Sequence, residues 1–122
     1  MKRSTAIAAT LFLGLAVYAF PDSREERAEK ERCLILSASR DETVTSTGIH
    51  VLVTARNGCS KDFSGTDTWF KVAAINQKNG GTSGTEVGHF QSTIKPGDKA
   101  ETYVGIACDP EERYSFKLTF WP

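Results

Sequence analysis

The sequence predicts an all-β fold, an antiparallel two-sheet sandwich, preceded by an apolar helix and a short charged helix. Three observations support this. Beyond residue 33, apolar and polar side chains alternate with the period of β-strands. Clusters of Gly, Pro, Asn and Asp separate these runs, as turns do. The chain has 122 residues, which is room for one domain.

The N-terminus has the pattern of an export segment. Lys2 and Arg3 precede an uncharged stretch over residues 4–20. At ~1.5 Å per residue this stretch spans about 25 Å, slightly less than the ~30 Å hydrocarbon core. We expect an uncleaved signal-anchor, and the alternative is a signal peptide cleaved after Ala19. Either interpretation places residues 21–122 outside the cytoplasm.

The domain organisation predicted is therefore a signal-anchor or signal peptide over 1–20, a charged helical connector over 21–32 and a sandwich over 33–122. Ser23 and Glu26 have capping-box spacing, which predicts a helix over about 24–32. Glu26 and Lys30 are spaced for an i,i+4 ion pair. Because this segment has no apolar stripe, we expect a solvated spacer, with a partner-docking arm as the alternative.

The body of the chain contains six candidate strands. Ile49, Val51 and Val53 alternate with polar neighbours, and Tyr114 to Phe120 alternate in the same way. A strand with one apolar face needs a second sheet to cover it, so we expect an immunoglobulin-like sandwich, with a small open barrel as the alternative. The predicted strands are 33–40, 48–57, 68–76, 86–94, 100–107 and 113–120.

Three cysteines in an exported domain predict one disulfide and one unpaired thiol. Cys59 and Cys108 both continue the inward register of their strands, so we predict that they pair. The second possibility is Cys33 with Cys59, because these residues lie at the open end of the first hairpin. A bulge near Asn57 would shift the alternation by one residue, so that Cys59 would no longer be expected to face inward.

Four short segments carry a resemblance to a known family. They read Val-Thr-Ala-Arg-Asn-Gly at 53–58, Trp-Phe-Lys-Val-Ala at 69–73, Gly-Thr-Glu-Val-Gly at 84–88 and Ile-Lys-Pro-Gly-Asp at 94–98. Over about residues 34–120 the chain resembles the FxLYD-type immunoglobulin-like domains of bacterial exported proteins. It departs after Phe70, where the Leu-Tyr-Asp run is absent. The resemblance implies a binding or scaffold module with no catalytic residues to transfer.

Few residues suggest chemistry. His50 and His89 fall on predicted solvent faces, and a two-histidine metal site would need adjacent strands and a third ligand. Asp109, Glu111 and Glu112 crowd one turn without the spacing of a calcium loop. Phosphate-loop, dinucleotide and zinc-protease motifs are lacking. We expect no catalytic, cofactor-binding or metal-binding residues, and therefore no enzyme.

Charge and aromatic residues bear on the partners. Fifteen basic residues balance fifteen acidic ones, which argues against nucleic-acid binding through bulk positive charge. We expect Trp69 and Trp121 to pack in the core or at its rim, and the alternative is that they are exposed interface residues, since tryptophan is enriched in binding hot spots. The sequence does not specify a ligand.

These features predict a non-catalytic accessory subunit on the extracytoplasmic face of a membrane protein complex. Its partners would be other subunits of that complex and the lipid bilayer, through residues 4–20. The domain would lie in the periplasm or at the cell exterior. The alternative is a cleaved, secreted or periplasmic binding module that recognises a protein or a glycan.

Overall fold

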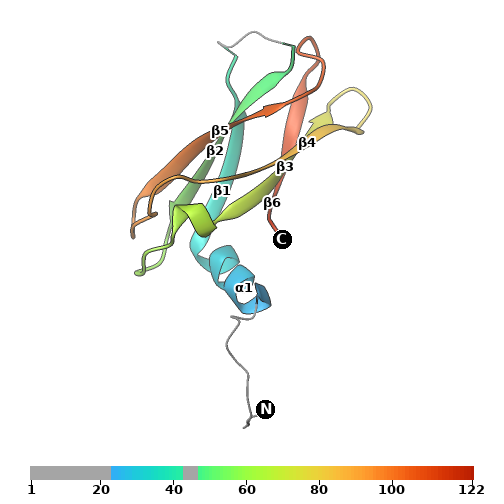
Figure 1. Ribbon diagram of the computed structural model, residues 1–122. Helices are drawn as coiled ribbons and strands as arrows, with labels where there is room; N and C mark the ends of the chain where they lie inside the picture. The colour runs from blue at the N-terminus through green and yellow to red at the C-terminus, as the bar shows by residue number, and fades with distance from the viewer. Residues whose placement is uncertain (1–22, 43–46) are drawn as a thin grey trace.

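The computed structural model describes residues 23–42 and 47–122, which form one α-helix, a short 3-10 turn and six β-strands (Figure 1). The predicted signal-anchor over 1–20 lies outside the described residues. Within the described residues, no helix combines the length and the apolar character needed to cross a membrane.

The charged helix is present as α1 (Ser23–Cys33). Arg27 and Glu31 form its i,i+4 ion pair, at 3.4 Å between Nε and Oε2. Lys30 does not make the predicted pair with Glu26. Its ammonium group instead donates to the carbonyl of Asp67 at 2.6 Å, so α1 is attached to the domain at this point, while most of its described side chains are exposed to solvent as expected.

Two three-stranded antiparallel sheets form the body, with strand orders β1-β2-β5 and β4-β3-β6 (Figure 1). The predicted all-β, two-sheet architecture is confirmed. The first sheet contains β1 (Leu34–Arg40), β2 (Ile49–Asn57) and β5 (Lys99–Ile106), and the second contains β4 (Thr82–His89), β3 (Trp69–Asn76) and β6 (Tyr114–Phe120).

The core lies between the sheets and follows the predicted alternation. Val51 and Val53 on β2, and Phe70 and Val72 on β3, are completely buried. Burying each such side chain contributes about 1.5–3 kcal/mol. On β1 and β6, Leu34 and Phe120 are buried, but the other inward-facing apolar residues are only partly buried: Leu36, Ala38, Tyr114, Phe116 and Leu118.

The fourth strand is displaced from its predicted range of 86–94. Residues 82–85 lie outside that range, but Thr82, Gly84 and Thr85 pair with β3. Gly84 and Gly88 let β4 approach β5 closely, since a Cβ on Gly84 would lie 2.7 Å from Cγ2 of Ile106. Beyond β4 the chain leaves the sheet, although Phe90 and Ile94 remain fully buried as expected.

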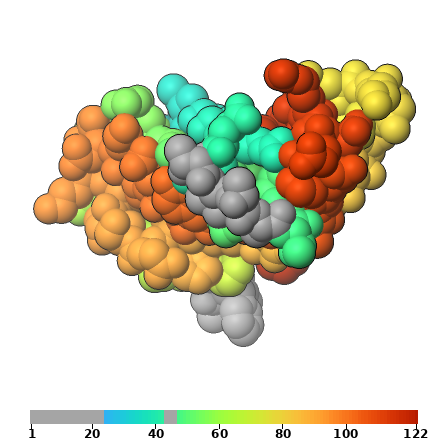
Figure 2. All heavy atoms as spheres, turned by 90° about the horizontal axis from the view of Figure 1, so that it is seen from above, coloured from blue at the N-terminus to red at the C-terminus, as the bar shows by residue number. Residues whose placement is uncertain are grey.

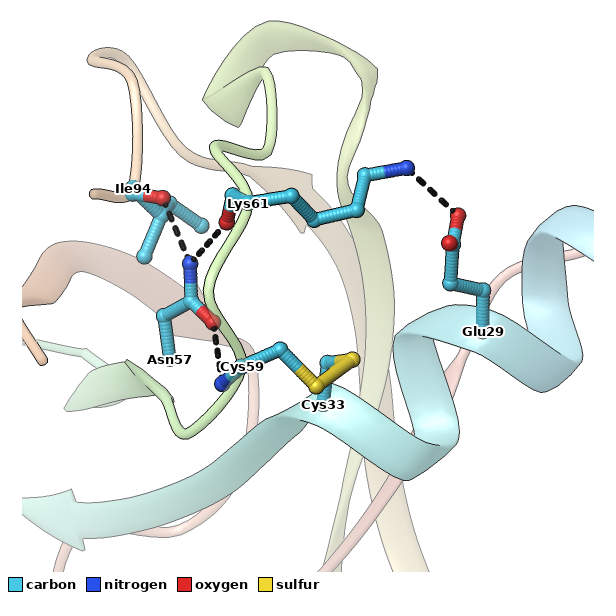
Figure 3. Close-up of a disulfide and its surroundings, with 6 residues drawn as sticks. All are labelled: Glu29, Cys33, Asn57, Cys59, Lys61 and Ile94. Carbon is cyan, nitrogen blue, oxygen red and sulfur yellow. Dashed lines mark hydrogen bonds and ion pairs between the residues drawn. A yellow bond between two sulfur atoms is a disulfide. The ribbon is translucent and has the colours of Figure 1, made fainter. Parts of the chain in front are cut away.

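The disulfide joins Cys33 to Cys59, with 5.1 Å between their Cα atoms (Figure 3). The predicted Cys59–Cys108 pair is wrong, and the second possibility is the one that forms. Strand β2 ends at Asn57, so its alternation does not extend to Cys59. Cys108 comes just after the end of β5, where Ile106 pairs with Ile49. Ile49 is ten residues before Cys59, so about 30 Å of strand separates the two ends. The thiol of Cys108 is unpaired.

Asn57 holds the loop that carries Cys59 (Figure 3). Its completely buried side-chain amide donates to the carbonyls of Lys61 and Ile94 at 2.7 and 2.9 Å. Its side-chain oxygen accepts from the backbone N–H of Cys59 at 2.9 Å. Every polar atom of this buried amide therefore has a partner, which is the condition under which burial of an amide is tolerated.

Arg40 joins the sheets at the opposite end. Its guanidinium donates to the carbonyls of Glu112 and Pro110 at 2.9 and 2.6 Å. The end of β1 and the segment leading into β6 consequently lie side by side when the molecule is seen from above (Figure 2). This contact closes one end of the boundary between the two sheets.

Replacement of Asn57 by alanine should lower the free energy of unfolding by about 3 kcal/mol, because one buried and two partly buried polar groups lose their partner. Urea denaturation followed by circular dichroism measures this. Asn79→Ala is the matched control, since Asn79 makes one exposed hydrogen bond, to Gly81, and should cost less than about 1 kcal/mol. Equal losses would contradict the role assigned to Asn57.

The double variant Cys33→Ala/Cys59→Ala should lose about 3 kcal/mol, because the bridge closes a loop across a sequence separation of 26. Cys108→Ala should cost less than about 1 kcal/mol, since its half-buried thiol is unpaired. Urea denaturation with and without reductant checks both values. A large loss in Cys108→Ala that disappears under reduction would restore the alternative pairing.

Candidate functional site

An exposed row of aromatic rings crosses the outer face of the β4-β3-β6 sheet at the end nearest α1. Trp69 begins β3 and stands opposite His89, the last residue of β4. Trp121 follows β6, and its backbone N–H donates to the carbonyl of Trp69 at 3.1 Å. The ring centroids lie 4.5 Å apart for Trp69 and His89, and 6.3 Å apart for the two tryptophans. We call Trp69, His89 and Trp121 the tryptophan row.

The tryptophan row leaves a large apolar surface in water. Trp69 is 38% exposed and Trp121 is 47% exposed. The sequence nominated both tryptophans individually, and the structure brings them together. The sequence pattern placed His89 on a solvent face but gave no sign of its contact with Trp69. Only the register of β3 against β4, which the sequence did not provide, could have identified that contact.

The remainder of this face is basic and lined by small side chains. Lys71 on β3 and Lys117 on β6 both project from it and are exposed. They border a shallow hollow of about 410 Å³ that also includes Ala73, Thr85 and Thr119. Among the described ion pairs, neither lysine has a carboxylate partner. We call this surface, together with the tryptophan row, the sheet face.

A second hollow, of about 500 Å³, lies between α1 and the loop that precedes β3, with Trp69 at its border. Both lysines that line it, Lys30 and Lys61, already have partners within the chain. Lys61 pairs with Glu29 at 2.9 Å between Nζ and Oε1, and Lys30 donates to Asp67. This hollow is therefore held together by contacts of the chain itself.

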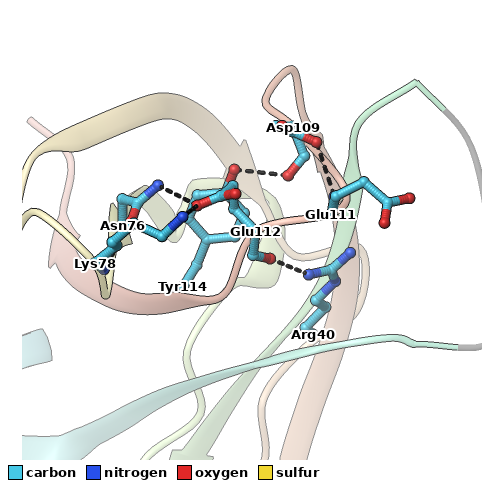
Figure 4. Close-up of polar contacts among 7 residues, drawn as sticks. All are labelled: Arg40, Asn76, Lys78, Asp109, Glu111, Glu112 and Tyr114. Atoms are coloured by element: carbon cyan, nitrogen blue, oxygen red, sulfur yellow. Dashed lines mark hydrogen bonds and ion pairs between the residues drawn. The ribbon is translucent and has the colours of Figure 1, made fainter.

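The acidic turn before β6 is also occupied by internal contacts (Figure 4). A side-chain oxygen of Glu112 lies 3.6 Å from Nζ of Lys78 and accepts from the amide of Asn76 at 3.3 Å. The carboxylate of Asp109 accepts from the backbone N–H of Glu111 at 2.8 Å. These contacts shape a turn.

Tyr114 completes this turn. Its hydroxyl donates to the carbonyl of Asp109 at 2.7 Å. Partial burial, a hydrogen bond with Cys108 and the nearby carboxylates of Asp109 and Glu112 raise the pKa of the phenol above its usual value. The phenol therefore resists ionisation even in alkaline solution and remains a hydrogen-bond donor.

The histidines are not brought together, because His50 lies on β2 and His89 on β4, in different sheets. Within residues 23–42 and 47–122, no group of three histidine, cysteine or acidic side chains has the arrangement of a metal site. The sheet face can instead offer aromatic surface for apolar contacts and two ammonium groups for an acidic partner.

Searches against protein families, curated proteins and solved structures find no match. The resemblance to FxLYD-type domains therefore stays a prediction drawn from the turn residues.

Proposed function

We propose that this chain is a non-catalytic accessory subunit, an immunoglobulin-like module outside the cytoplasm that binds another protein through its sheet face. Residues 4–20 anchor it in the bilayer, and the partner is another subunit of a membrane complex. The observation that carries this proposal is the tryptophan row, because two half-exposed tryptophans side by side are typical of a protein-binding hot spot.

The strand order supports the immunoglobulin-like assignment. In that fold the first, second and fifth strands (A, B and E) share a sheet, and the strands C and F pair in the other. Here β1, β2 and β5 form one sheet, and β3 pairs with β6 in the other. Strand β4 occupies the position beside C that variable-type domains fill with an extra strand.

The direction of α1 supports a partner close to the membrane. The helix has 11 residues and a length of about 16 Å, and it leaves the sandwich at the end that carries the tryptophan row. If residues 4–20 lie in the bilayer, that end of the domain lies within a few tens of ångströms of the lipid surface. The Cys33–Cys59 disulfide is consistent with an oxidising compartment.

The double variant Trp69→Ser/Trp121→Ser should abolish assembly with the partner while the domain stays folded, because hot-spot tryptophans dominate interface energies. The full chain, expressed in its native host, is solubilised gently and its complexes are weighed by native mass spectrometry. Tyr103→Ser is the matched control, since Tyr103 is 58% exposed on the other sheet. Loss of assembly in both variants, or in neither, would contradict a site at the tryptophan row.

The intact mass of the chain in the same sample distinguishes the anchored subunit from the cleaved module. A mass that begins at Met1 in the membrane fraction supports the anchor. A mass that begins at Phe20 in the soluble fraction overturns it and leaves a secreted or periplasmic module that binds through the same face.

A further inference from the structure

One edge of the β4-β3-β6 sheet has free hydrogen-bonding groups. Strand β6 pairs with β3 on one side, and no strand within residues 23–42 and 47–122 pairs with its other side. We propose that this edge binds an extended, acidic segment of a partner protein, which adds to the sheet as a further antiparallel strand beside β6.

The backbone of β6 alternates between its two sides. Gln77 donates to the carbonyl of Arg113, and Trp121 donates to that of Trp69, so the odd-numbered residues of β6 bond to β3. The N–H and C=O groups of Phe116 and Leu118 therefore point away from β3, toward the free edge. A strand placed there would meet both residues' donors and acceptors in register.

The side chains beneath this edge would gain cover from such a strand. Phe116 and Leu118 face the core, but both remain partly exposed, as do Leu36 and Ala38 on β1. The inward row of β2, by contrast, is fully buried at Val51 and Val53. An added strand with apolar residues at alternate positions would therefore complete the burial of this side of the core.

The charges of the edge select the partner. Lys117 is the one charged residue within Tyr114–Phe120, and Lys71 lies diagonally beside it on the neighbouring strand. A glutamate or aspartate opposite Lys117 on the outward face of the added strand would stand close to the Lys117 ammonium group, and Lys71, one strand further away, adds positive charge to the same face. A second copy of this chain is disfavoured, because symmetric pairing along the whole of β6 places Lys117 opposite Lys117.

The test uses the full chain, labelled with nitrogen-15, in detergent micelles. The probe is a peptide of about ten residues in which valine alternates with threonine around a central glutamate. Amide hydrogen exchange by NMR should slow at least tenfold at Phe116 and Leu118 when the peptide binds. The amides of Ser115, Lys117 and Thr119 already bond to β3 and should keep their protection, which also confirms that the sheet is folded.

Charge is tested with the same readout. Lys117→Glu should weaken binding two- to tenfold, because an attractive cross-strand pair becomes a repulsive one. Lys95→Glu makes the same change of charge in an exposed turn away from the edge and should leave the affinity unchanged. A peptide with lysine in place of glutamate should bind correspondingly more weakly.

Three results would overturn the proposal: unchanged exchange at Phe116 and Leu118, equal binding of the acidic and basic peptides, or protection that grows with protein concentration in the absence of peptide. The last would identify a second copy as the occupant. The edge and the tryptophan row are tested by different variants, so failure of edge pairing leaves the proposed function standing.

Discussion

The buried side chain of Asn57 fixes the loop on which the candidate site depends. Its three hydrogen bonds hold residues 58–62 in one conformation and connect them to Ile94. That conformation turns Cys59 toward Cys33, so α1 is joined covalently to the sandwich. It also places Phe63 in a bridge with Ile94, a few residues before the 3-10 turn that leads into Trp69. The buried amide, with no unsatisfied polar atom, therefore orders the segment that leads toward Trp69, and the pairing of β3 with its two neighbours then places the tryptophan row.

Local patterning was sufficient to predict most of the architecture. Alternation at Ile49–Asn57 and Tyr114–Phe120 identified the buried face of each strand, because one face of a sheet must be apolar when it covers a core. Turns at Gly80 and Gly97 were also predictable, and both glycines have the positive φ that such turns require. The range predicted for β4 was wrong because this segment is rich in Ser, Thr and Gly. Its pairing with β3, rather than its own composition, makes it a strand.

The site was less predictable, because it depends on register and on loops. The alternation of inward and outward residues does not continue past the end of a strand. The prediction that Cys59 pairs with Cys108 extended it beyond Asn57 and is therefore wrong. The composition nominated Trp69 and Trp121, but only the pairing of β3 with both neighbours places them beside His89. The free edge of β6 follows from strand order, which single-strand patterning does not determine.

The most direct measurement of whether the sheet face is the binding surface is site-specific photo-crosslinking in native membranes. A photoreactive amino acid replaces Thr85 or Thr119 on the sheet face, and Ser37 or Glu101 on the outer face of the other sheet; all four positions are exposed. We expect one discrete protein adduct from Thr85 and Thr119 and none from the other two. Adducts of equal yield from both faces, or only from Ser37 and Glu101, would contradict the account.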